Sequence, residues 1–155
     1  MRDMTTTAML GVVILLTGAV KVPSPVAGGE FQLSAPLAVL ICAYFGFSRY
    51  FTAGILASFL GLLLGTSNLF NIAIALVFRL IVGAVVSITP RKSLPLLMLS
   101  GPVGTFCARI VVAQLLHIQW QILAVAAIPG MIFTAVAVGL AYKPGLKLLQ
   151  RYKFI

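Results

Sequence analysis

Two arginines lie inside runs of apolar residues, where a charge has little solvent. Arg79 is near the middle of NIAIALVFRLIVGAVVS, and Arg109 lies within MLSGPVGTFCARIVVAQLLH. Charged residues at the centre of a membrane are costly and usually face a bundle interior or a wet cavity. A planar guanidinium matches carboxylate and phosphate geometry. The pair therefore predicts a site for an anionic group. The alternative is that both side chains bond helix carbonyls or extend to the interface.

Small or polar residues accompany each arginine at a spacing of four, namely Asn71, Ala75 and Gly83 with Arg79, and Gly101 and Thr105 with Arg109. Counted from the outer helix ends at 1.5 Å per residue, Arg79 lies about 15 Å deep and Arg109 about 12 Å deep. The two guanidiniums could therefore face each other. No acid lies within an apolar run, but Glu30, in the first external loop, has the reach to fold over the site. The candidate substrate-binding residues are Arg79, Arg109, Asn71, Gln114, Trp120 and Glu30. Trp120 is also typical of an interfacial anchor.

The motifs of common enzymes and nucleotide hydrolases are missing from the sequence. There is no GxxxxGK[ST] phosphate loop, no HExxH motif and no carboxylate pair. Cys42 and Cys107 stand in apolar runs without a CxxC motif, and His117 is alone, so we expect no metal or cofactor. Without an acid or His inside a span, a proton relay is not expected either. The sequence thus predicts a protein that is not an enzyme.

Composition identifies the environment that must position these residues. Of 155 residues, 61% are hydrophobic and 8% charged, whereas a soluble domain carries roughly a quarter charged residues. The net charge of +9 would suggest nucleic acid in a soluble protein. Here the basic residues are scattered through apolar segments and loops, so the composition predicts a multi-pass membrane protein with no nucleic-acid partner.

Breaker and polar clusters divide the chain into six apolar runs, at roughly 5–21, 33–47, 50–66, 69–89, 94–116 and 121–142. A bilayer core of about 30 Å takes about 20 helical residues. We therefore predict an all-α integral membrane protein, with a six-helix bundle forming one domain over residues 1–155. The second and third runs are short, but Arg49 between them favours two helices over one re-entrant hairpin.

The loop charges predict the orientation of the bundle. With six spans and both termini in the cytoplasm, one basic loop residue, Lys21, lies outside. The inside set is Arg2, Arg49, Arg91, Lys92, Lys143, Lys147, Arg151 and Lys153. Positive charge accumulates on the cytoplasmic side of membrane proteins. The predicted location is a cell membrane, with both ends inside.

The chain resembles the substrate-binding (S) component of energy-coupling-factor (ECF) vitamin transporters. The likeness rests on six short spans in about 150 residues and on the stretch TAMLGVVILLTGAVKVPSPVAGGEFQLSAPLAVLICAYFGFSRYFTAGILASFLGLLLG. This stretch combines a first helix, a Pro/Gly-rich loop ending in Gly-Gly and a polar residue, a helix pair with a short turn, and a Gly-rich third helix.

The resemblance implies a membrane-embedded vitamin binder, in a prokaryotic cell membrane, that docks on a transmembrane coupling subunit and two ATPase subunits. It places the site in the outer halves of the fourth to sixth helices, under the first and third external loops. Family members often dock through an Ala-x-x-x-Ala face on the first helix. Here Val12 follows Ala8 at that spacing, and only Thr7 and Gly11 approximate the face.

The arginines favour a carboxylate or phosphate substrate, and a biotin-like acid is one candidate. Two other classes of protein remain open. One is a stand-alone transporter or channel for an organic anion. The other is a structural or assembly subunit of a membrane complex that binds no ligand.

Overall fold

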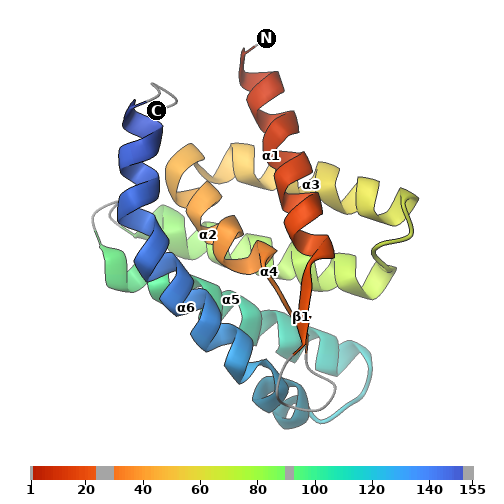
Figure 1. Cartoon of the computed structure of the whole chain (residues 1–155). Coiled ribbons are helices and arrows are strands. Elements are labelled where there is room, and N and C mark those ends of the chain that lie inside the picture. The colour runs from red at the N-terminus through yellow and green to blue at the C-terminus, as the bar shows by residue number, and fades with distance from the viewer. Residues whose placement is uncertain (1, 24–29, 90–92, 152–155) are drawn as a thin grey trace.

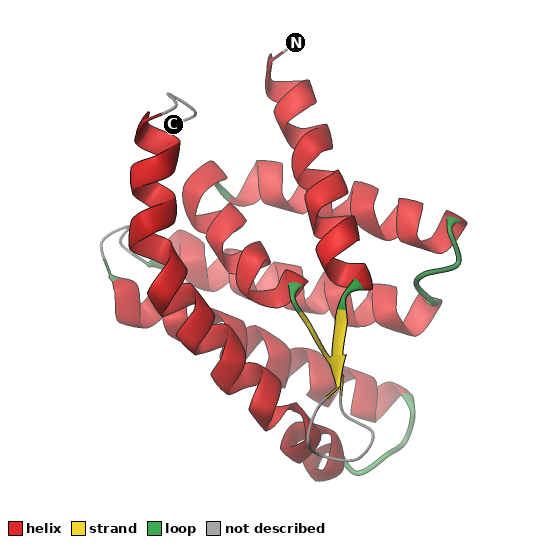
Figure 2. Cartoon of the chain, viewed as in Figure 1, coloured by secondary structure: helices red, strands yellow, loops and turns green. Residues whose placement is uncertain are grey.

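The computed structural model describes residues 2–23, 30–89 and 93–151, and only the backbone of residues 2, 21–23 and 30–32. Within these ranges the chain forms six helices and one short hairpin (Figures 1 and 2). The elements are α1 (Arg2–Ala19), β1 (Lys21–Pro23), β2 (Glu30–Gln32), α2 (Ser34–Phe45), α3 (Phe47–Leu63), α4 (Leu69–Ile88), α5 (Leu94–Leu115) and α6 (Trp120–Arg151). The predicted helical fold is confirmed. The hairpin was not predicted; its strands are antiparallel, with Val22 opposite Phe31.

Three helices are long and apolar enough to cross a membrane, namely α4, α5 and α6. The other three are shorter apolar helices. With 12 residues, α2 is about 18 Å long at 1.5 Å per residue, less than the bilayer core. Its residues Val39 and Cys42 are almost fully buried, so its neighbours cover much of this helix.

Gly46 forms the turn between α2 and α3. This residue has φ +85°, a left-handed conformation that side chains with a Cβ rarely adopt. Its N–H donates to the carbonyl of Cys42, and its own carbonyl accepts from the N–H of Tyr50. The third helix therefore begins at Phe47 and ends at Leu63, three residues earlier at each end than the predicted 50–66. Arg49 belongs to its first turn.

Small residues set the distance between neighbouring helices, as is common in membrane bundles. A Cβ on Gly104 of α5 would meet Phe78 and Val82 of α4, and one on Gly101 would meet Thr134 of α6. Helix α5 is thus packed closely between α4 and α6. On the other side of the bundle, a Cβ on Gly11 of α1 would lie 3.2 Å from the carbonyl oxygen of Ala53 in α3.

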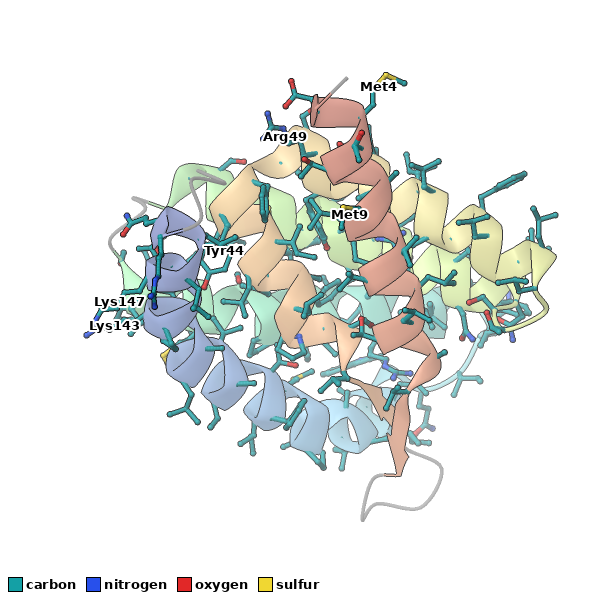
Figure 3. The ribbon with its side chains drawn as sticks, turned by 45° about the horizontal axis from the view of Figure 1, so that its top comes forward. Met4, Met9, Tyr44, Arg49, Lys143 and Lys147 are labelled. Carbon is teal, nitrogen blue, oxygen red and sulfur yellow. The ribbon has the colours of Figure 1, made fainter. Side chains whose placement is uncertain are left out.

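The last helix continues nine residues past its predicted end at 142, through Pro144 to Arg151. The Tyr44 hydroxyl of α2 donates to the carbonyl oxygens of Tyr142, at 2.8 Å, and Ala141. Its ring also stacks on that of Tyr142. Gly145 leaves room for this approach, because a Cβ there would meet the Tyr44 hydroxyl. Tyr44 therefore donates to two backbone carbonyls of α6 just before Pro144; Figure 3 labels it between α2 and α6.

The ends of the helices fall into two groups. Both chain termini lie at the top of Figure 1, and the turn from α2 to α3 lies toward the upper left. The strands and the turn from α5 to α6 lie at the bottom, and the turn from α3 to α4 lies at the right. An ion pair of 2.6 Å between Asp3 and Arg49 joins the first turn of α1 to that of α3; Figure 3 labels Arg49.

Candidate functional site

A cavity of about 610 Å³ lies within the bundle, and every one of the six helices contributes to its wall. Ligand sites in proteins commonly measure about 300–1,000 Å³. Most of the lining is alanine, glycine and larger apolar residues. The polar and charged lining residues are Ser34, Tyr50, Ser58, Thr66, Ser67, Asn71, Arg79, Thr105, Arg109 and Thr134. A cavity of this size and lining can hold a small, partly apolar molecule.

Arg79 reaches the cavity from α4 and is only 7% exposed. Its Nη1 donates a hydrogen bond of 2.7 Å to Ser58 Oγ on α3. The side chain crosses directly over Gly54, where a Cβ would meet the Nε, Cδ and Cζ atoms of Arg79. Gly54 thus provides the space that Arg79 occupies, and Ser58, one turn further along α3, fixes the guanidinium.

Arg109 reaches the same cavity from α5, together with Thr105. Its Nε atom is buried and has no hydrogen-bond partner. The position of Arg109 along the bundle can be judged from Gly104, which packs against Phe78 and Val82 of α4. Five residues beyond Gly104, Arg109 lies about 7 Å closer to the end of α5 that leads to α6. Arg79 extends in the same direction to reach Ser58, so the two cationic side chains line one cavity from different walls.

No acid among the described side chains accompanies the two arginines. Asp3, one of two acidic residues in the sequence, pairs with Arg49 at the surface. The other is Glu30, whose backbone belongs to β2 but whose side chain lies outside the described residues. The predicted folding of Glu30 over the site therefore stays a prediction.

The other candidate residues divide between the cavity and the surface. Asn71 lines the cavity, and its backbone N–H donates to Asn68 Oδ1 at the start of α4. Gln114 is exposed and does not line the cavity. Trp120 is 46% exposed, and its ring lies edge-on to Phe106 at a centroid distance of 6.2 Å. Neither Gln114 nor Trp120 therefore contributes to the wall around the arginines.

The candidate docking pair is only partly accessible. Gly11 is buried against Ala53 of α3. Thr7 is half-buried, and its hydroxyl donates to the carbonyl of Asp3 within α1. Gly11 thus packs within the chain, and of the two only Thr7 reaches the surface.

Three residues of α3 that sequence reasoning missed belong to the site. Tyr50, Gly54 and Ser58 follow one another at intervals of four, on the helix face that meets Arg79. Tyr50 is fully buried, and its hydroxyl has no hydrogen-bond partner. Their spacing was a possible signal, because residues four apart share a helix face.

The chemistry available here is binding by hydrogen bonds and charge. The cavity presents two guanidiniums and several hydroxyls. Among the described residues, no group of three or more His, Cys, Asp or Glu could hold a metal ion. The arrangement is suited to an anion with an apolar body.

Comparison with known proteins finds a relative in Lysinibacillus sphaericus, protein BioX. The two are 46% identical over 136 residues, which make up 88% of this chain and 81% of the relative. No family model matches the chain, and no solved structure matches it.

Proposed function

The chain belongs to the family of protein BioX, and we propose that it is a membrane-embedded substrate-binding subunit that captures a small anionic vitamin-like molecule for uptake. One observation carries this proposal. Arg79, which is buried, and Arg109, which is half-buried, line one cavity within the bundle, and no described acid neutralises them. A buried charge normally has a partner, and an anionic ligand would supply it.

The lining favours a carboxylate with an apolar body over a strongly hydrophilic anion. Arg79 and Arg109 supply the charge, whereas the alanines and larger apolar residues of the wall suit an aliphatic chain. Asn71 and the hydroxyls would bind neutral polar groups of the ligand. A biotin-like acid combines these features and is our first candidate.

We further propose that the chain works with a coupling subunit and two ATPase subunits of the ECF type. The resemblance to S components supports this arrangement. So does the lack of a phosphate loop in the sequence, since the energy for uptake would then come from partner subunits. Sustained accumulation of biotin by the purified chain alone in proteoliposomes would favour a stand-alone transporter instead.

The proposed topology has six crossings with both termini in the cytoplasm. Figure 1 supports this topology. Both termini and the α2–α3 turn lie away from the α3–α4 and α5–α6 turns. Helix α2 is short for a lipid-facing span, but its buried residues lie against other helices. Such a segment need not match the bilayer thickness, because the surrounding protein shields its ends.

The test is paired melting and binding measurements on purified Arg79→Gln and Arg109→Gln proteins with biotin. Each arginine should contribute roughly 1.5–3 kcal/mol through charge-assisted hydrogen bonds. Loss of one should therefore weaken affinity by about tenfold to over a hundredfold. Lysine should restore little, because it lacks the planar fork. Without ligand, both variants should melt no lower than the wild type, since each loses a buried or half-buried charge that has no counter-ion among the described residues.

Arg49→Gln is the matched control, because Arg49 is exposed and does not line the cavity. Its affinity for biotin should equal that of the wild type. Destabilised ligand-free proteins with an unchanged ligand-induced shift would refute the binding role of the arginines. They would then be packing residues, as expected of a structural subunit.

A further inference from the structure

The hydroxyl of Tyr50 is unused in the ligand-free chain. The side chain lines the cavity and is fully buried, and its hydroxyl oxygen has no hydrogen-bond partner. Buried tyrosines usually satisfy this group. A leucine or phenylalanine could fill the same space without leaving a polar atom unpaired. The position therefore points to a partner that arrives with the ligand.

The neighbours of Tyr50 indicate which part of a ligand this would be. Arg79 lies along the same face of α3, over Gly54 and bonded to Ser58. The Ser58 oxygen accepts from Arg79, which leaves the Ser58 proton free to donate elsewhere. Tyr50, Arg79 and Ser58 thus bring hydroxyl and guanidinium donors to one wall of the cavity. Donors without an acceptor suit an anionic oxygen.

The position of Tyr50 along α3 distinguishes the two ends of this cavity wall. Tyr50 lies in the first turn of α3, next to the α2–α3 turn, whereas Asn71, Thr66 and Ser67 line the cavity near the α3–α4 turn. The Tyr50 end is therefore the deeper one for a molecule that enters from the side of the α3–α4 turn.

We propose that Tyr50 donates a hydrogen bond to the carboxylate of the bound ligand, jointly with Arg79, so that the ligand enters with its carboxylate first. This rests on the proposed function. Arg109, on another wall of the cavity, is then available to a second polar group of the ligand. Tyr50 is a specificity residue in this arrangement, because it distinguishes a carboxylate from an uncharged end group.

The experiment compares wild type and Tyr50→Phe proteins with two probes, biotin and its primary amide. Removal of the hydroxyl should weaken biotin binding by roughly tenfold, because a hydrogen bond to a charged group is lost. The effect should be clearly smaller for the amide, since coupling between two changes identifies groups in contact. Without ligand, Tyr50→Phe should melt at or above the wild-type temperature, because no hydrogen bond is lost.

Tyr44→Phe is the matched control. Its hydroxyl bonds carbonyls of α6 and lies outside the cavity, so this variant should melt below the wild type and bind biotin normally. Equal biotin affinity in Tyr50→Phe and wild type would overturn the inference, as would an equal loss for biotin and amide. A wild type that binds neither probe would count against the proposed function instead. In that case a Tyr50→Phe protein that melts below the wild type would also overturn the role of Tyr50.

Discussion

Gly54 is the residue on which the position of Arg79 depends most directly. The arginine side chain occupies the space that a Cβ at this glycine would need. Backbone conformation plays no part, because Gly54 lies within the regular helix α3. Gly54 therefore contributes to the site by leaving space for Arg79, and not by contacting a ligand through a side chain.

We predict that Gly54→Ala displaces Arg79 and weakens biotin binding by at least about tenfold, the loss expected when a charge-assisted hydrogen bond is disrupted. Isothermal titration of the purified protein measures this. The control is Gly139→Ala, whose Cβ would press on the flexible end of Met98 and which does not line the cavity. Equal losses in the two variants would mean that general packing, and not Arg79, determines affinity.

The two arginines could be predicted from the sequence because a charge within an apolar run needs a special environment. Their partners could not. Gly54 and Ser58 look like ordinary small residues of a membrane helix, and only the packing of α4 on α3 brings Arg79 to them. Gln114 illustrates the opposite error. It follows Arg109 by five residues, which turns it about 140° around the helix, away from the cavity.

At the scale of elements, the number of helices could be predicted from the apolar runs. The residues at which the helices begin and end could not, because they depend on local contacts. The second and third helices were displaced from prediction because Gly46 adopts a positive φ and starts α3 early. The last helix passes Pro144, which would be expected to end it, and Tyr44 of α2 packs against this part of α6 through its ring and its hydroxyl. Such tertiary contacts cannot be read from spacing along one segment.

The ion pair between Asp3 and Arg49 connects the beginnings of α1 and α3. Both side chains are substantially exposed, at 79% and 42%, and exposed pairs contribute about 0–1 kcal/mol. We predict that Asp3→Asn lowers the melting temperature only slightly in low salt, and not measurably in high salt, where the pair is screened.

Lys147→Gln serves as the control for this change, because Lys147 is exposed and lies at the outer surface of α6 (Figure 3). It should not alter the melting temperature at either salt concentration. A large, salt-independent loss in Asp3→Asn would contradict the prediction and indicate that Asp3 has a structural role beyond the ion pair.

At the scale of the whole molecule, the orientation of the bundle can be tested directly. In a background without Cys42 and Cys107, we predict that a membrane-impermeant thiol reagent added to intact cells labels Asn68→Cys but neither Ser93→Cys nor Gln150→Cys. Asn68 precedes α4, Ser93 precedes α5, and Gln150 is near the end of α6, so the three positions sample opposite ends of the bundle.

Permeabilised cells provide the control, because all three cysteines should then react if they are accessible. Labelling of Ser93→Cys or Gln150→Cys in intact cells would contradict the orientation inferred from the loop charges. Labelling of none of the three, in either condition, would mean that the positions are shielded, and neighbouring residues would be used to repeat the measurement.

The cavity wall, to which all six helices contribute, also has a consequence for biogenesis. Thr134, Gly130 and Ala127 of α6 belong to it, so a nascent chain that has not yet inserted its last helix has an open, incomplete pocket. A ligand that needs the closed wall binds only finished molecules. At a ligand concentration one hundred times Kd, it stabilises them by about 2.7 kcal/mol relative to forms that cannot bind. Cells supplied with the ligand would then retain more of the mature protein, and truncated or mis-inserted chains would be left to membrane proteases.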